Sequence, residues 1–154
     1  ALNQLLAPTG LYMDSHNTLY ITDSGNYRIM AYTYNAKNGT MVAGTGVLGS
    51  SMSQLNSGAR YLFVDSNRNV YVSDQVNQRV IRWQIGNSTG TIAAGTGTAG
   101  SLSTQVNYPY GMWVDSNLNL YVAEYNNHRV TKWAPASSSG VTVAGTGTGG
   151  TFYN

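Results

Sequence analysis

The hydrophobic positions of this chain fall in short runs that are separated by polar turn residues. In its last third, residues 111–115, 119–124, 129–134 and 140–144 carry Val, Tyr, Trp and Leu between stretches of Asn, Ser and Gly. Runs of this length and composition predict β-strands, and no window keeps helical periodicity long enough for a helix. The segment therefore indicates a unit of four short strands.

This four-strand pattern occurs three times along the chain. The sequence LYITD at 19–23 returns as VYVSD at 70–74 and as LYVAE at 120–124. The spacing is 51 residues from Asp14 to Asp65 and 50 residues from Asp65 to Asp115, so the second unit carries one extra residue in the loop that leads into it. We place the units, in chain order, at 1–52, 53–103 and 104–154.

Four antiparallel strands repeated at this period predict an all-β chain of three β-propeller blades. Stacked blades cover both faces of each small sheet, which explains why strands such as 120–123 are apolar nearly throughout. Propellers usually have about four to eight blades, so three cannot close a ring. We expect half of a six-blade propeller or an open stack. Because the chain begins with Ala1 rather than Met, we expect a processed product or a segment of something longer.

The segment after each second strand resembles the NHL repeat, a β-propeller blade. Its pattern, Asp-x-x-Asn-x-Arg-Ile/Val, recurs in all three units, with Glu124 in place of the aspartate in the third. Only Asn127-His128 keeps the Asn-His pair, and Tyr27 and Gln78 replace the histidine elsewhere. The second unit also lacks the Pro-x-Gly that leads into the other two, and we expect this loop to differ in shape. In the NHL-like amidating lyase the resemblance implies a zinc site of several histidines, but this chain has only two, at unrelated repeat positions.

All six acidic residues occupy two repeat positions, at the ends of the first and second strands of each unit. We expect each carboxylate at the end of a second strand to pair with the arginine that begins the third strand, as a structural contact. The predicted structural motif consists of Asp23, Asn26, Arg28, Asp74, Asn77, Arg79, Glu124, Asn127 and Arg129.

The composition excludes several classes of chemistry. Charged residues are only 9% of the 154 residues, the net charge is +2 and there is no cysteine. We therefore predict no catalytic residue, no metal site and no cofactor, and no binding to nucleic acid or insertion into a membrane.

Two motifs resemble ligand-binding loops but are explained by the blade structure. The Gly-x-Gly-x-x-Gly at 44–49 recurs at blade spacing with no helix expected after it, which indicates a connection between blades. The Asp-rich segment at 65–69 lacks the glycine and glutamate of a calcium loop, and we interpret it as an Asx turn.

Two surface features are candidate binding or modification sites. Most aromatic residues occupy strand positions, where core packing is expected, but the loops leading into the second and third units offer a ligand-facing rim: Arg60, Tyr61, Tyr108 and Tyr110. Asn38 and Asn87 stand in N-glycosylation sequons within equivalent loops.

These observations predict a non-enzymatic, extracellular scaffold, glycosylated and self-associating through blade faces as a closed dimer or a head-to-tail filament. Its partners are further copies of itself or further blades of a longer chain, with a glycan or protein as a possible ligand. The alternative is half of a ligand-binding or lyase-type propeller. We expect Trp133→Asp to prevent assembly by burying an unpaired charge.

Overall fold

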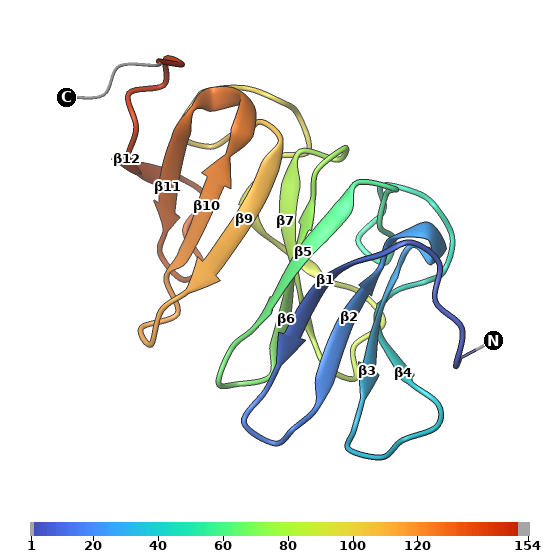
Figure 1. The fold of residues 1–154 in the computed structure, drawn as a ribbon. Coiled ribbons are helices and arrows are strands. Elements are labelled where there is room, and N and C mark those ends of the chain that lie inside the picture. The colour runs from blue at the N-terminus through green and yellow to red at the C-terminus, as the bar shows by residue number, and fades with distance from the viewer. Residues whose placement is uncertain (1, 151–154) are drawn as a thin grey trace.

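The computed structural model of the chain describes residues 2–150 and is composed of three four-stranded antiparallel sheets (Figure 1). In every sheet the strands lie in chain order, as successive hairpins do. The chain is therefore all-β and forms three propeller blades, as the sequence predicted. Blade 1 contains β1 (Pro8–Met13), β2 (Leu19–Asp23), β3 (Arg28–Tyr32) and β4 (Thr40–Gly44). Blade 2 contains β5 (Ala59–Val64), β6 (Asn69–Asp74), β7 (Arg79–Gln84) and β8 (Thr91–Gly95), and blade 3 contains β9 (Pro109–Val114), β10 (Leu120–Glu124), β11 (Arg129–Trp133) and β12 (Gly140–Ala144).

The first hairpin of each blade is closed by an aspartate. The Asp14 Oδ1 atom accepts hydrogen bonds from the backbone N–H groups of His16 and Thr18, each at 2.9 Å. Asp65 and Asp115 accept the same pair of bonds from the residues two and four places further on. These carboxylates therefore form Asx turns, which confirms the structural interpretation of the Asp-rich segments.

The turn between the second and third strands is strained in the same way in every blade. It is a 3-10 turn in blades 1 and 3, η1 (Ser24–Asn26) and η2 (Tyr125–Asn127). The residue that follows the turn adopts a left-handed backbone, with φ of 52° at Tyr27, 50° at Gln78 and 48° at His128. These are the three positions where the NHL histidine is expected. The backbone conformation at this position is therefore the same in all three blades, although the residue differs.

Among the described residues, no helix has the length and apolarity needed to cross a membrane.

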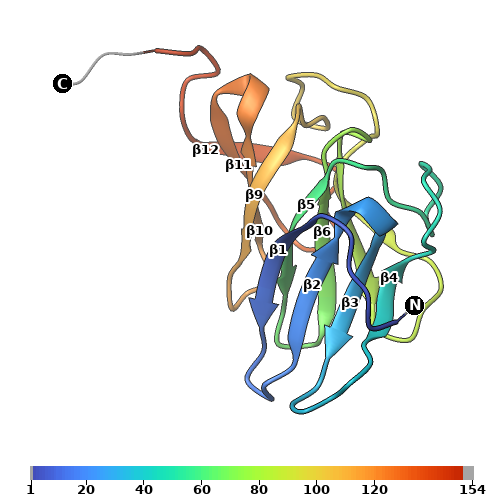
Figure 2. The same cartoon turned by 45° about the vertical axis from the view of Figure 1, so that its right-hand side comes forward.

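The three blades meet at their first strands. β5 lies between β1 and β9, and the other strands of each blade fan outward from this inner layer (Figures 1 and 2). The backbones approach closely here, because a Cβ atom on Gly10 would lie 2.5 Å from the carbonyl oxygen of Arg60 and 3.2 Å from the Cα atom of Tyr61. A glycine at this position lets β1 and β5 pack side by side.

Two apolar cores lie between the blades. One joins blades 1 and 2 and includes Tyr20, Ile29, Leu62 and Trp83. The other joins blades 2 and 3 and includes Phe63, Val80, Val114, Val122 and Trp133. The single sheet of blade 2 thus contributes one face to each core, which explains the nearly continuous apolar runs in its strands.

The connections between blades follow the expected pattern. The Gly-rich segments at 44–49 and 95–100 lead from β4 to blade 2 and from β8 to blade 3, and no helix follows either of them in the described chain. The loop into blade 2 differs in shape, as predicted. Ala7 and Tyr108 have a left-handed backbone in the other two blades, whereas in the loop into blade 2 the Ala59 N–H donates to the Asn56 carbonyl and closes a turn.

Candidate functional site

The carboxylate at the end of each second strand is paired with the arginine that opens the third strand. The closest nitrogen–oxygen distances are 2.7 Å for Arg28–Asp23, 2.9 Å for Arg79–Asp74 and 3.2 Å for Arg129–Glu124. All three carboxylate side chains are fully buried. The antiparallel register places each pair directly across the hairpin, which confirms the predicted pairing.

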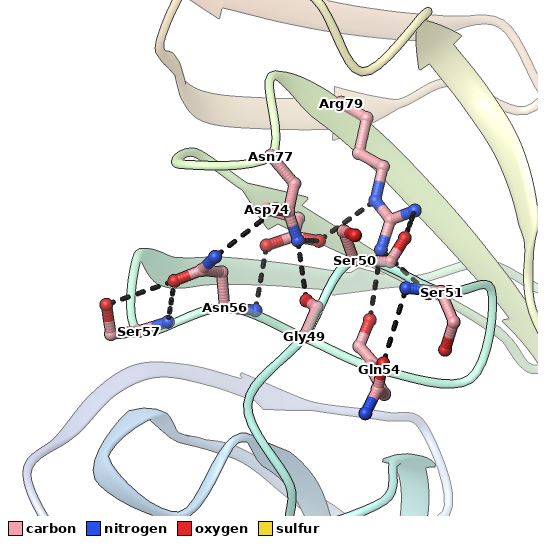
Figure 3. A network of polar contacts seen from close by, with 9 residues as sticks. All are labelled: Gly49, Ser50, Ser51, Gln54, Asn56, Ser57, Asp74, Asn77 and Arg79. Atoms are coloured by element: carbon pink, nitrogen blue, oxygen red, sulfur yellow. Dashed lines mark hydrogen bonds and ion pairs between the residues drawn. The ribbon is translucent and has the colours of Figure 1, made fainter.

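Each pair also fastens the loop that arrives from the preceding segment, as blade 2 illustrates (Figure 3). The Asp74 carboxylate accepts hydrogen bonds from the Asn56 backbone N–H at 3.1 Å and from the Asn77 side-chain amide at 2.8 Å. The guanidinium group of Arg79 donates to the carbonyl oxygens of Ser50, Ser51 and Gln54 at 2.8 to 3.0 Å.

Blades 1 and 3 repeat this arrangement. Arg28 donates to the Gln4 carbonyl and Arg129 to the Ser101 carbonyl, at 2.9 and 2.8 Å, and the Asn26 and Asn127 amides donate to their own blade's carboxylate. The motif residues therefore hold loops to sheets. Within residues 2–150 no group of three or more His, Asp or Glu side chains is arranged to hold a metal ion.

The four residues of the predicted ligand rim lie at the start of β5 and β9, where the inner strands begin. The structure brings Tyr61 and Tyr110 together across blades 2 and 3, with ring centroids 5.0 Å apart. Their mutual contact raises the pKa of the Tyr61 hydroxyl above its ordinary value of 10.0. A fourth tyrosine, Tyr125 in η2, was not among the residues predicted from the sequence. The centroid of its ring lies 6.1 Å from the ring centroids of both Tyr110 and Tyr108. We call Tyr61, Tyr108, Tyr110 and Tyr125 the tyrosine rim.

Backbone contacts from neighbouring elements fix the position of the rim. The Gln78 side-chain oxygen accepts a hydrogen bond from the Tyr108 backbone N–H at 2.7 Å, and the Tyr108 carbonyl accepts one from Tyr125 at 3.1 Å. Arg60 donates from Nε to the side-chain oxygen of Gln75 at 3.2 Å. Gln78, one of the residues that replaces the NHL histidine, thus joins blade 2 to blade 3.

The outward face of blade 1 is apolar and uncovered. Leu11 is 68% exposed, whereas Leu62, which holds the same repeat position in blade 2, is 7% exposed in the core against blade 1. Leu5 is likewise exposed while its equivalents Leu55 and Val106 are fully buried. The difference arises because blade 1 has no blade packed on this face in the described chain.

The free face of blade 3, at the opposite end of the molecule, is also apolar and uncovered in the described chain. Trp113 is 60% exposed on the free face of blade 3, whereas Phe63 at the same repeat position of blade 2 is 7% exposed. Val143 is exposed as well, while Val42 at its position in blade 1 is buried against blade 2. We call these two surfaces the blade-1 face and the blade-3 face.

Trp133 does not belong to either free face. It is buried in the core between blades 2 and 3, and its indole N–H donates to the Thr131 hydroxyl at 3.0 Å. Trp133→Asp therefore does not distinguish assembly from folding, because a charge at this buried position would disrupt the fold of the single chain.

The remaining candidate residues lie on the surface. Asn38 and Asn87 are both exposed, in the loops that join the third and fourth strands of blades 1 and 2. The two histidines, His16 and His128, are exposed in different turns. The histidines thus have no shared site.

The chain resembles known propellers in sequence motif and in fold. A family model, the NHL repeat, matches residues 106–133, which contain the first three strands of blade 3. No curated protein sequence matches the chain.

Solved structures with the same fold include two enzymes. A virginiamycin B lyase from Staphylococcus aureus superposes with a TM-score of 0.60 at 15% identity, over 84% of this chain and 39% of that one. A gluconolactonase from Xanthomonas campestris gives 0.65 at 13% identity, over 94% and 49%. A protein of unknown function from Bacteroides thetaiotaomicron gives 0.68 at 20% identity, over 90% and 36%. The chain thus spans less than half the length of each, and identities this low indicate a shared fold alone.

Proposed function

We propose that this chain, a β-propeller whose residues 106–133 match the NHL repeat, is a non-enzymatic scaffold that self-associates through its two free blade faces. We place this scaffold outside the cell, where the exposed sequons at Asn38 and Asn87 are available for glycosylation. The chain has few charged residues and no cysteine, which fits association through contacts between apolar blade faces.

The observation that carries the proposal is the contrast between equivalent repeat positions. Positions that are buried where one blade packs on the next are exposed at the two ends, as Leu11 and Trp113 show. Monomeric proteins rarely leave extended apolar patches uncovered, and such patches mark interaction surfaces. The apolar character of these faces therefore predicts a partner that covers them.

A second copy of this chain is the partner that fits. The blade-1 face and the blade-3 face are the two halves of a contact that already occurs twice within the chain, between blades 1 and 2 and between blades 2 and 3. The blade-3 face even repeats a basic residue of the inner contact, since Lys132 lies 5.6 Å above the Tyr121 ring where blade 2 carries Arg82 beside Tyr71. Head-to-tail contacts of this kind close a ring of two copies or extend as a filament.

The polar residues support a non-enzymatic role. Enzymes with this fold exist among the structural neighbours, but the six carboxylates of this chain all bind backbone or arginine groups of the fold. General acid–base catalysis needs such a group held in reach of a substrate. The carboxylates here are instead occupied in Asx turns and in loop attachment.

A longer propeller is the second candidate, because this chain covers less than half of each matched structure. In that case further blades of the same polypeptide cover both faces. Both candidates use the same surfaces, and the behaviour of the isolated chain separates them.

The test is to weigh the purified chain by light scattering over a range of concentrations and to image it by electron microscopy. We expect a closed particle of twice the 16.5 kDa chain mass, or filaments whose mass grows with concentration. Val143→Asp on the blade-3 face and Leu11→Asp on the blade-1 face should each give monomers, because each buries a charge without a partner. Val76→Asp is the matched control, since Val76 is an exposed apolar residue on the middle blade.

Mixing the two variants makes the test specific. The Val143→Asp chain keeps an intact blade-1 face and the Leu11→Asp chain keeps an intact blade-3 face, so the mixture should form one-to-one pairs and nothing larger. A wild-type chain that stays monomeric at all concentrations would overturn self-association and favour the longer propeller.

A further inference from the structure

The tyrosine rim is an exposed aromatic surface at the start of the inner strands of blades 2 and 3. Tyr61, Tyr110 and Tyr125 are all exposed large side chains, and Tyr125 is 66% exposed. Their rings form a continuous series that crosses from blade 2 to blade 3, with successive centroids 5.0 and 6.1 Å apart. Adjacent exposed rings are costly to leave against water, so this cluster is a candidate binding surface.

The polar groups beside the rings add directional hydrogen bonding. Asn107 and Asn126 are joined to each other beside η2, with the Asn126 amide donating to the Asn107 oxygen at 3.2 Å. Behind Arg60, the buried Gln75 amide binds the Arg60 Nε through its oxygen, while its Nε2 atom has no partner. A buried donor without a partner is unusual in a folded protein. The site thus combines apolar ring faces with hydroxyl, amide and guanidinium groups.

We propose that the tyrosine rim binds a neutral polysaccharide. A sugar ring has an apolar face of C–H groups and a rim of hydroxyls, and a tyrosine offers an apolar ring with a polar tip. Tyr61, Tyr110 and Tyr125 would each stack on the C–H face of one sugar unit. The tyrosine hydroxyls, Arg60 and the Asn107–Asn126 pair would bind the sugar hydroxyls.

Two other classes of polymer also stack on aromatic residues, and the site fits them less well. Single-stranded nucleic acid needs a positively charged groove along its backbone, and the loops that carry the rim supply a single base, Arg60. Proline-rich peptides dock into aromatic-lined grooves. Here the neighbouring ring centroids are 5.0 and 6.1 Å apart, so the rings pack on one another and do not form the separated walls of a groove.

Isothermal titration of the full chain with soluble hexasaccharides tests this proposal. The probes are cellohexaose, chitohexaose, xylohexaose and mannohexaose, and we expect at least one to bind. Tyr61→Ala and Tyr110→Ala should each raise its Kd about tenfold or more, the effect of losing one stacked ring worth about 1.4 kcal/mol. Tyr110→Phe keeps the ring and should stay within about threefold of the wild type.

Tyr34→Ala is the matched control, because Tyr34 is 80% exposed and lies in the loop between β3 and β4. It should leave the Kd unchanged, and thermal unfolding should show that every variant is folded. Binding that survives both rim alanine variants, or the absence of binding to all four sugars, overturns the proposal. Binding of a proline decapeptide or of oligo-dT in place of the sugars, lost in the same variants, would assign the rim to that class instead.

The titration is also made on the Val143→Asp variant, which we expect to be monomeric. Tyr125 holds the repeat position of Ser24 and Gln75, which are buried between blades, so a second copy on the blade-3 face would cover it. In the monomer Tyr61, Tyr110 and Tyr125 are all exposed. The polysaccharide proposal and the self-association proposal can therefore fail separately.

Discussion

Individual charged residues in this protein serve the architecture of the blade. The Arg79 guanidinium contacts one carboxylate and three backbone carbonyls, and its side chain is almost fully buried. Charge-assisted hydrogen bonds of this kind are stronger than neutral ones. Removing one partner of a buried pair is costly, because the other charge stays buried without compensation.

Arg79→Met should therefore lower the free energy of unfolding by about 3–5 kcal/mol. The substitution leaves the Asp74 carboxylate buried without its cation and frees the carbonyls of Ser50 and Ser51. Urea denaturation monitored by tryptophan fluorescence measures the change. Lys37→Met is the control, since Lys37 is an exposed base in the loop after β3, and it should change stability by less than about 0.5 kcal/mol. An equally small effect of Arg79→Met would contradict a structural role for the pair.

The packing of the inner strands depends on backbone-to-backbone contact between elements. β1 approaches β5 so closely at Gly10 that a side chain at this position would overlap the Arg60 carbonyl. The hydroxyl of the neighbouring Thr9 donates to the same carbonyl at 3.0 Å. The junction between blades 1 and 2 therefore rests on the small residue at the centre of β1 as well as on the apolar core.

Gly10→Ala should destabilise the fold by about 1–3 kcal/mol, the usual cost of overpacking a filled site. The added Cβ atom must push β1 away from β5, because its closest neighbour is the backbone carbonyl oxygen of Arg60 in that strand. The measurement is chemical denaturation in the monomeric Val143→Asp background, which removes any contribution from assembly. A variant as stable as its parent would show that the inner strands can separate without loss.

At the scale of the whole molecule, the blade-1 face and the blade-3 face each lack the neighbouring blade that covers the equivalent surface inside the described chain. Gly111 holds the place of Gly10 in blade 3, but a Cβ atom there would meet nothing closer than Ala123 at 4.0 Å. The space beside Gly111 is open because the described chain has no blade beyond blade 3. In a head-to-tail assembly, β1 of the next copy fills this space.

Gly111→Ala should therefore behave differently in the monomer and in the assembly. In the Val143→Asp background it should leave the free energy of unfolding unchanged, whereas in the wild type it should weaken association about tenfold or more, as about 1.4 kcal/mol of lost packing implies. Analytical ultracentrifugation measures the second effect. Unchanged association would argue that the faces do not meet as they do between blades 1 and 2.

The sequence by itself determined the strands, the three blades and the carboxylate–arginine pairs. These features follow from local patterns, such as the apolar runs that end in Asp23, Asp74 and Glu124, and the patterns occur in every repeat. They can be predicted from the sequence because each blade packs in the same way and therefore needs the same residue types at the same positions.

Only the tertiary structure decided which residues are covered and which residues meet. Trp113 and Trp133 look alike in the sequence, yet one lies on a free face and the other in the core between blades 2 and 3. Tyr125 joins the tyrosine rim because the turn between β10 and β11 lies beside the start of β9, a contact that no spacing in the chain announces. Burial depends on the neighbouring blade, and the local sequence of a strand does not record whether that neighbour is present.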